Sequence, residues 1–286
     1  MPEARFQYLA RLAVLAGLIV WGPSCQTGTP AAGPQTHSTG PGATTRSAPA
    51  PTADLAGVLQ HAVTSGGWVV VDNLQERAGL LQAYLDRLAT HGPTTTPGEY
   101  PTGEDRLAYW LNARTACSLK LGLLAGCPPR LTPAQLSGAF RLDGRTLHLE
   151  DIDAALAAEG GWRALCGAPG VTMDRAAPPR RPFVPGDVRA ALQERVDAFV
   201  HDAERFEIDV DTRQVRLPAV FWGQRGRLIE QYARASGAKS PTLWSALQDG
   251  LGGLARQRLQ DAVGYQVVEA PADGQTCFKK WYELLN

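Results

Sequence analysis

The most strongly patterned segment of the chain is residues 104–124, which read EDRLAYWLNARTACSLKLGLL. Its apolar side chains recur at helical spacing and form one stripe: Leu107, Trp110, Leu111, Cys117, Leu121 and Leu124. Arg114 falls in the middle of this stripe. A buried guanidinium is costly unless it meets a carboxylate or lines a cavity. The segment therefore predicts a core helix with either a structural ion pair or a binding site at Arg114, and the adjacent amide of Asn112 needs partners in both cases.

A β-hairpin is expected shortly after this helix. Asp143-Gly144 is typical of a two-residue type I′ turn, and apolar residues lie on both sides of it. In the register that this turn imposes, Phe140 faces Leu147. The hairpin is therefore the most sharply defined strand pair in the sequence.

The remaining patterned segments lie in residues 54–286 and are mostly helical. These residues contain no internal repeat. Helices are predicted at Asp54–Thr64, Leu74–Thr90, Glu150–Ala158, after an Asp187 cap, at Ala219–Arg234 and after a Ser240 cap; strands are predicted at Trp68–Val71 and Tyr265–Glu269, and a second hairpin at Phe206–Leu217. Residues 54–286 thus predict a single helix-rich α+β domain with one core and two β-hairpins or a small antiparallel sheet. A signal peptide and a disordered linker are expected to precede it.

Residues 1–25 predict a secretory signal peptide. Arg5 and Arg11 precede ten uncharged residues, Leu12–Trp21, a run too short for a membrane-spanning helix. The small residue Ser24 directly before Cys25 resembles the lipobox of bacterial lipoproteins, in which the cysteine is acylated after cleavage. Ordinary cleavage with release, or an N-terminal core helix, are the alternatives.

Residues 26–53 predict a flexible linker, because 24 of these 28 residues are Pro, Gly, Ser, Thr or Ala. A linker directly after an acylated Cys25 is the arrangement expected of a lipoprotein that holds its folded domain away from a membrane. The sequence therefore predicts an exported protein of the cell envelope or periplasm, anchored to the membrane through a lipid on Cys25.

Charge and motifs exclude several other functions. The 28 basic and 28 acidic residues give a net charge of zero, whereas proteins that bind nucleic acid electrostatically carry a basic excess. The sequence holds no phosphate-binding loop, dinucleotide fingerprint or His-Glu-x-x-His zinc motif. We therefore expect no nucleic-acid partner, no cofactor and no metal.

Four cysteines follow the linker, and an oxidising compartment would allow one or two disulfides among Cys117, Cys127, Cys166 and Cys277. Three full connectivities are possible and spacing does not select one. Cys166, which precedes Gly167 at the start of a loop, is the best-placed candidate nucleophile. It needs a histidine within hydrogen-bond reach to act as one.

Five stretches, in order, resemble the domain-of-unknown-function 547 family. Arg106–Asn112 is similar to its leucine-alanine-phenylalanine-tryptophan-isoleucine-asparagine hallmark, and the further stretches are residues 147–153, 164–167, 215–222 and 285–286. Together they cover roughly residues 75–286. The resemblance implies a fold and a pocket location, and it places Asn112, Arg114, Asp153, Trp162 and Cys166 at the pocket positions.

The departures from the family pattern fall on these same positions. Arg114 stands where the family has tyrosine, Trp162 where it has histidine, and Asp153 where it has glutamate. The family's asparagine-cysteine becomes Cys166-Gly167, which moves the thiol by one position. The resemblance therefore implies a degenerate pocket, in which Arg114 and Asp153 pair.

Three functional hypotheses follow. The first is a binding or scaffolding role toward a small-molecule or protein partner. The second is a cysteine-dependent hydrolase or acyl transferase that uses Cys166. The third is a purely structural envelope protein, in which the Asn112 and Arg114 region is filled.

Overall fold

The computed structural model describes residues 52–271 and 274–284. These residues contain ten α-helices and seven short strands. The helices are α1 Ala53–Ala62, α2 Val71–Glu76, α3 Ala78–Thr90, α4 Gly103–Leu124, α5 Pro133–Leu136, α6 Leu149–Gly167, α7 Val188–His201, α8 Ala219–Ser236, α9 Leu243–Gly250 and α10 Gly253–Asp261. The strands are β1 Val69–Val70, β2 Phe140–Leu142, β3 Arg145–Leu147, β4 Glu207–Asp209, β5 Gln214–Leu217, β6 Gln266–Glu269 and β7 Phe278–Lys279, with 3₁₀ turns at Pro97–Glu99 and Trp281–Leu284. The predicted helix-rich α+β fold is confirmed. The predicted signal peptide, Cys25 and nearly all of the linker lie outside the described residues.

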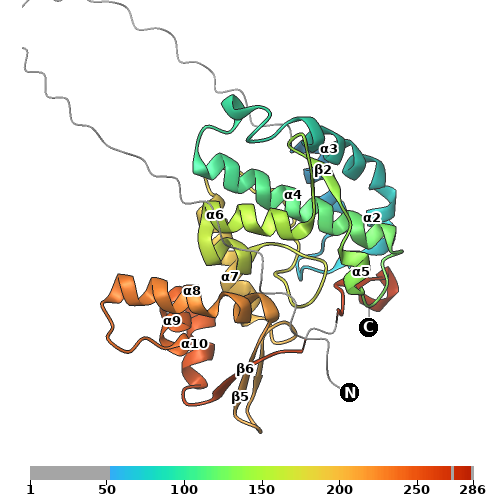
Figure 1. Cartoon of the computed structure of the whole chain (residues 1–286). Helices are drawn as coiled ribbons and strands as arrows, with labels where there is room; N and C mark the ends of the chain where they lie inside the picture. Colours follow the sequence, from blue (N-terminus) through green and yellow to red (C-terminus); the bar gives the residue numbers. More distant parts are fainter. Residues whose placement is uncertain (1–51, 272–273, 285–286) are drawn as a thin grey trace, which may run out of the picture. The chain divides into compact units, whose positions relative to one another are not determined.

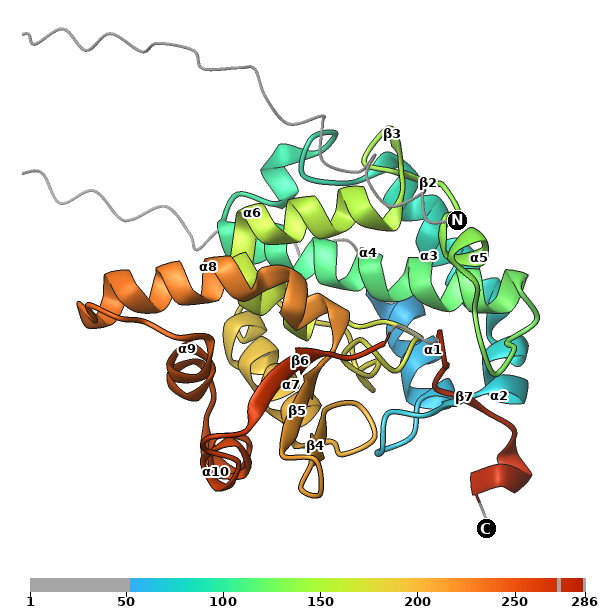
Figure 2. The ribbon, with the colours of Figure 1, turned by 60° about the horizontal axis from the view of Figure 1, so that its bottom comes forward.

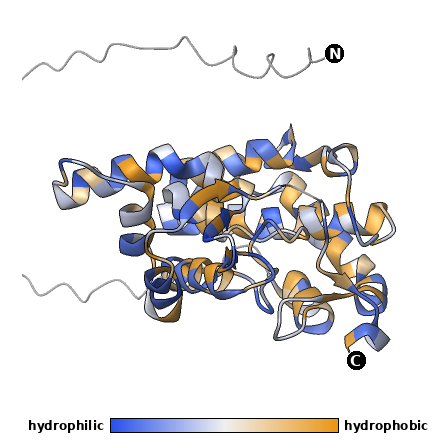
Figure 3. Cartoon of the chain, turned by 90° about the horizontal axis from the view of Figure 1, so that it is seen from below, coloured by the Kyte–Doolittle hydropathy of each residue, from blue (hydrophilic) through white to orange (hydrophobic). Residues whose placement is uncertain are grey.

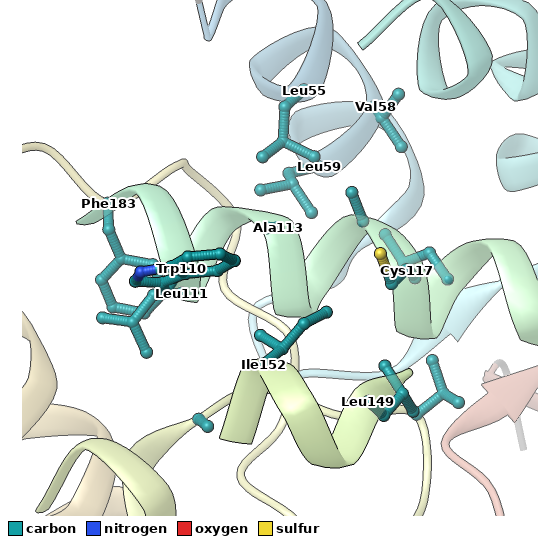
Figure 4. Close-up of a cluster of buried hydrophobic side chains, with 14 of the residues drawn as sticks. Leu55, Val58, Leu59, Trp110, Leu111, Ala113, Cys117, Leu149, Ile152 and Phe183 are labelled. Carbon is teal, nitrogen blue, oxygen red and sulfur yellow. The ribbon is translucent and has the colours of Figure 1, made fainter. Parts of the chain in front are cut away.

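Helix α4 packs between α3 on one side and α6 on the other (Figure 1). Its first turn is fixed by a capping box, in which the Thr102 hydroxyl accepts from the main-chain N–H of Asp105 and the Asp105 carboxylate accepts from that of Thr102. Residues 107–119 are all buried, because neighbouring helices cover more than one face of α4. Figure 4 shows Leu59 of α1 and Ile152 of α6 packed against opposite sides of α4.

The first hairpin has the predicted register. Phe140 of β2 pairs with Leu147 of β3, and the turn residues Asp143 and Gly144 have φ angles of 52° and 73°. The buried Asp143 carboxylate also accepts hydrogen bonds from the main-chain N–H groups of Thr94 and Thr95 at 2.8–3.0 Å. The turn therefore anchors the loop that follows α3 as well as closing the hairpin.

The second hairpin joins a three-stranded sheet of mixed direction. Strands β4 and β5 are antiparallel, as predicted, but β6 lies parallel to β5, with Val215 opposite Val267 (Figure 2). The parallel pairing arises because α8, α9 and α10 lie between β5 and β6 in the chain and bring β6 back in the same direction. The sheet is therefore not purely antiparallel.

Two hydrophobic clusters, rather than the single core predicted, stabilise the described residues, which form one compact unit. The first cluster is built from α1–α4, the first hairpin and much of α6. The second contains residues from α7–α10 and the three-stranded sheet, together with Trp162 and Cys166 near the end of α6. Helix α6 therefore contributes to both clusters.

Helix α6 extends beyond its predicted end. The prediction ends the helix at Ala158, just before Gly160-Gly161, but the helix resumes after Gly161, whose φ of 64° and ψ of −152° break the helical path. Only glycine adopts such a conformation at low cost. The chain continues as helix because the residues after the break, including Trp162 and Cys166, bury their side chains in the second cluster.

Other predicted boundaries shift by a few residues. The predicted helix over Leu74–Thr90 is two helices, α2 and α3, separated at Arg77. Helix α9 begins after Thr242, whose hydroxyl caps the main-chain N–H of Ser245, and not after Ser240. Asp187 does hold the N-cap position of α7, but its side chain makes no capping hydrogen bond.

Apolar and polar segments alternate along most of the helices, as Figure 3 shows. Such alternation is typical of helices that bury one face and expose the other. Within the part of the chain that the structure describes, no helix combines the length and the apolar character needed to cross a membrane.

Candidate functional site

The predicted pairing of Arg114 with Asp153 is confirmed. Arg114 Nε donates to Asp153 Oδ1 at 2.8 Å, and Arg175 donates from its η2 nitrogen to Asp153 Oδ2 at 2.9 Å. The Arg114 side chain is 5% exposed, and its η1 nitrogen also donates to the Ser118 hydroxyl and to the carbonyl oxygen of Pro169. Asp153 thus holds two guanidiniums, one on each carboxylate oxygen.

Electrostatics favour the ionised form of this cluster. Burial acts to raise the pKa of Asp153, but the Arg114 and Arg175 guanidiniums outweigh it and hold that pKa below its usual value. Burial lowers the pKa of Arg114, yet arginine starts so far above neutrality that it stays charged. At neutral pH the cluster is therefore a structural ion-pair network, in which one carboxylate binds two guanidiniums.

The amide of Asn112 also has a complete set of local partners. Its Nδ2 donates to the carbonyl oxygen of Phe183 at 2.9 Å, and its Oδ1 accepts from the main-chain N–H of Phe183 at 2.8 Å. The side chain thus pairs with the main chain as a neighbouring β-strand does. Figure 4 shows the Phe183 ring beside Trp110 and Leu111, at one end of α4. Asn112 therefore fixes the loop between α6 and α7 to the central helix.

Cys166 and Trp162 lie in the second hydrophobic cluster, and Arg175 is close enough to both Asp153 and Cys166 to affect the pKa of each. The Cys166 side chain is fully buried, and burial raises the pKa of its thiol, with Arg175 opposing the shift. Trp162 is 4% exposed and lies under Gly250, while the Arg163 guanidinium stacks on its ring at 4.5 Å. The structure therefore does not assemble the five predicted pocket residues into one open pocket.

Three of the four described histidines make hydrogen bonds, and none of these bonds is to Cys166. His61 pairs with Glu76 at 2.9 Å, the ring of His91 bonds the Thr90 hydroxyl, and the ring of His148 bonds the carbonyl oxygen of Ser137. Over residues 52–271 and 274–284, no imidazole hydrogen-bonds the Cys166 thiol. In this part of the chain, therefore, no histidine is placed to take the proton from the Cys166 thiol and activate it as a nucleophile.

No disulfide joins the four cysteines of the described region, and all four are buried. Burial raises the pKa of Cys127 to about 11, with the nearby Cys277 thiol adding to the shift. The same described residues contain no group of three or more His, Cys, Asp or Glu side chains that could hold a metal ion.

Asn112 lines a small cavity on the side of α4 that faces α3. The cavity has a volume of about 40 Å³, and its polar walls include Tyr84, Tyr100 and Tyr109. Burial raises the pKa of all three phenols, so they are protonated and act as neutral hydrogen-bonding groups. A space of this size accommodates about one to three water molecules and no larger ligand.

A much larger groove lies on the other side of the Phe183 loop, and the sequence analysis did not predict it. It has a volume of about 740 Å³ and is lined by Arg180, Arg181 and Arg195 among other residues. A smaller chamber of about 150 Å³ shares Arg180 and Arg195 with it. Together the walls of the groove and the chamber include the guanidinium groups of Arg180, Arg181, Arg195 and Arg205.

The sequence does contain a signal for the groove and the chamber: as at Arg114, an arginine interrupts the apolar stripe of a helix. Arg195 lies three residues after Leu192 and four before Phe199, within the apolar stripe of α7. An arginine in such a position must be compensated by a partner or a ligand. The sequence predicts this helix after the Asp187 cap, but the prediction does not single out Arg195.

Comparisons with known proteins identify no relative: no family model matches the chain, and no curated protein or solved structure matches it. The resemblance to the domain-of-unknown-function 547 family therefore stays a prediction.

Proposed function

We propose that the described residues form a non-catalytic binding or scaffolding domain of an exported protein, held at a membrane by an acylated Cys25. The observation that carries the proposal is the Arg114–Asp153–Arg175 cluster, which fills the position where the family resemblance locates a pocket. A carboxylate with both oxygens bound to guanidiniums is poorly suited to proton transfer, because its charged form is stabilised.

The burial of Cys166 supports the same proposal. A cysteine nucleophile needs access to substrate and a lowered thiol pKa. Cys166 is fully buried and its pKa is raised, so the thiol form predominates at neutral pH. Its environment is that of a small apolar core residue.

A turnover screen tests the non-catalytic part of the proposal. The full chain is incubated with chromogenic acyl esters and thioesters, alongside Cys166→Ser and the matched control Cys117→Ser, which alters an equally buried cysteine in the first cluster. We expect no turnover above the uncatalysed rate from any of the three. Turnover that disappears only in Cys166→Ser would establish the cysteine-dependent enzyme, and turnover that survives this change would establish an enzyme with a site elsewhere.

Intact-mass measurement tests the anchor. We expect the protein isolated from its native membrane to begin at Cys25 and to carry a diacyl or triacyl addition. An unmodified N-terminus beyond Thr27 would contradict acylation while leaving export intact. Mature protein that still contains residues 1–20 would contradict both.

A further inference from the structure

The small chamber beside α7 gathers positive charge. Arg180 of the loop before α7, Arg195 of α7 and Arg205 of the loop after it line the chamber, and Asp202 is the only carboxylate on its wall. Asp202 is already engaged, because its Oδ2 lies 3.1 Å from Arg205 Nε. The chamber therefore carries a net positive charge from Arg180 and Arg195.

Arg195 is half-buried and makes no ion pair with the described part of the chain. Its Nε atom is shielded from solvent and makes no hydrogen bond to the described residues, and no carboxylate there lies within ion-pair distance of its guanidinium. Burial, with Arg205 nearby, lowers the pKa of Arg195 to about 10, so the group is still charged at neutral pH. A half-buried cation with a shielded, unpartnered Nε atom is a favourable place for an anion to bind.

The opposite wall of the chamber is a tight turn with free main-chain donors. The turn spans Thr64–Gly67, and within the described residues the N–H groups of Ser65 and Gly66 donate to no acceptor. Gly67 has a φ of 76°, and a Cβ there would lie 2.4 Å from the Cβ of Ala177. Glycine is therefore required for the turn to approach the arginine loop this closely.

The loop that presents Arg180 is restrained by its own sequence. Pro178 and Pro179 precede Arg180, and Pro182 follows Arg181. Proline fixes its own φ angle and limits the residue before it to extended conformations. The hydrogen bonds between Asn112 and Phe183 hold the same loop to α4. The arginines are thus presented on a pre-organised loop.

The neighbouring groove has a different character. Its walls include the carboxylates of Asp187 and Glu194, which offset the charge of Arg181, and the apolar side chains of Phe183 and Ala191. The excess of positive charge therefore lies in the chamber, and the groove suits an uncharged or weakly polar body. A volume of about 150 Å³ is similar to that of cavities that hold a molecule the size of benzene.

We propose that this chamber binds the phosphate group of a small phosphorylated molecule, whose organic body lies in the adjoining groove. Guanidiniums bind phosphate oxygens in pairs, and free main-chain N–H groups supply further donors to the same anion. The proposal rests on the proposed binding role and names its ligand class.

Inorganic phosphate is the probe for the test. Its affinity for the full chain is measured by calorimetry in a chloride buffer of constant ionic strength, for the wild type, Arg195→Gln and the exposed Arg180→Gln. We expect saturable binding to the wild type and an affinity about tenfold weaker in each variant, because each removes a charge-assisted contact. Arg141→Gln removes the same charge from an exposed position that lines none of these cavities, and we expect its affinity to stay within about twofold of the wild type.

Three results would overturn the proposal. The first is phosphate binding no stronger than chloride binding, and the second is an equal loss in Arg141→Gln. The third is co-sedimentation with vesicles of phosphatidic acid in phosphatidylcholine that added phosphate reverses and that Arg195→Gln abolishes, which would assign the site to a lipid headgroup. Failure of phosphate to bind refutes the ligand class alone, whereas failure of the binding role shows itself in the turnover screen.

Discussion

Arg114 and Arg195 are two arginines placed alike in sequence and differently in structure. Each interrupts the apolar stripe of a long helix, α4 or α7, and burial lowers the pKa of both. Asp153 of α6 meets Arg114 at 2.8 Å, whereas the Arg205 guanidinium lowers the pKa of Arg195 further and no carboxylate pairs with it in the described residues. Helical periodicity thus places a cation on the core face of a helix, but the packing of other elements decides whether a carboxylate meets it.

The largest expected effect on the free energy of unfolding comes from removing the carboxylate of Asp153. Asp153→Ala leaves both Arg114 and Arg175 without their anion, so we expect the free energy of unfolding to fall by about 3–5 kcal/mol. Arg114→Met should cost less, because Asp153 keeps Arg175 as a partner. Urea denaturation of the full chain measures both values.

The double variant sharpens this expectation. Arg114→Met combined with Asp153→Ala removes the buried cation together with its anion, and it should recover part of the loss seen in Asp153→Ala alone. A cost below about 1 kcal/mol for Asp153→Ala would show that the pair contributes no more than an exposed salt bridge. The contrast with Arg195 would then be lost.

The next effect concerns Asn112, which joins helix α4 to the loop that carries Arg180 and Phe183. Asn112→Ala leaves the buried N–H and C=O groups of Phe183 unpaired, at a cost of about 2–4 kcal/mol in unfolding free energy. It should also weaken phosphate binding, because the loop that carries Arg180 loses its attachment to α4. Thermal denaturation and calorimetry report the two effects separately.

Thr115→Val is the matched control for Asn112→Ala. Thr115 is equally buried on the same helix, but its hydroxyl donates only to the carbonyl oxygen of Leu111, one turn earlier. We expect a cost near 1 kcal/mol and unchanged phosphate affinity. An Asn112→Ala variant as stable as the control would contradict the role of Asn112 in fixing the loop.

Local signals predicted the features that depend on neighbours in sequence. Asp143-Gly144 fixed the hairpin register because a two-residue turn permits one alignment of its strands. The stripe of α4 predicted the burial of Arg114, and the family resemblance selected Asp153 as its partner. Both predictions needed only short-range geometry or a known pattern.

Features that depend on distant contacts were missed. The glycine pair at 160–161 is a common helix end, and only burial of Trp162 and Cys166 in the second cluster explains why α6 resumes. The parallel pairing of β6 with β5 depends on three intervening helices. The chamber around Arg195 is formed by a turn near residue 65 and a loop near residue 180, which no local pattern brings together.

A smaller effect is expected on the pH dependence of the unfolding free energy, and it concerns Asp153 with its two guanidinium partners. The folded-state pKa of Asp153 lies below its unfolded value of about 3.9, so its contribution is present above pH 4 and is lost as pH falls through the folded pKa. We expect the stability difference between wild type and Asp153→Ala to be constant from pH 6 to 8 and to shrink as the pH falls through the folded-state pKa. A stability difference that keeps its full size on acidification would contradict the assignment to Asp153.

The smallest expected effect has the opposite sign and concerns Arg195. Its folded-state pKa of about 10 lies below the ordinary arginine value, so the unfavourable burial of its charge is fully present at neutral pH. Arg195→Met keeps the apolar stem and removes that charge, and we expect it to raise the free energy of unfolding by about 1 kcal/mol in phosphate-free buffer. Adding phosphate should stabilise the wild type but not this variant, since an anion that binds only the folded state shifts the equilibrium toward it. Arg189→Met, on the same helix with an exposed partner in Glu104, should change stability by no more than about 0.5 kcal/mol and keep the phosphate response. A loss of 2 kcal/mol or more in Arg195→Met without phosphate would show that protein groups already compensate the guanidinium, which would make Arg195 a second Arg114.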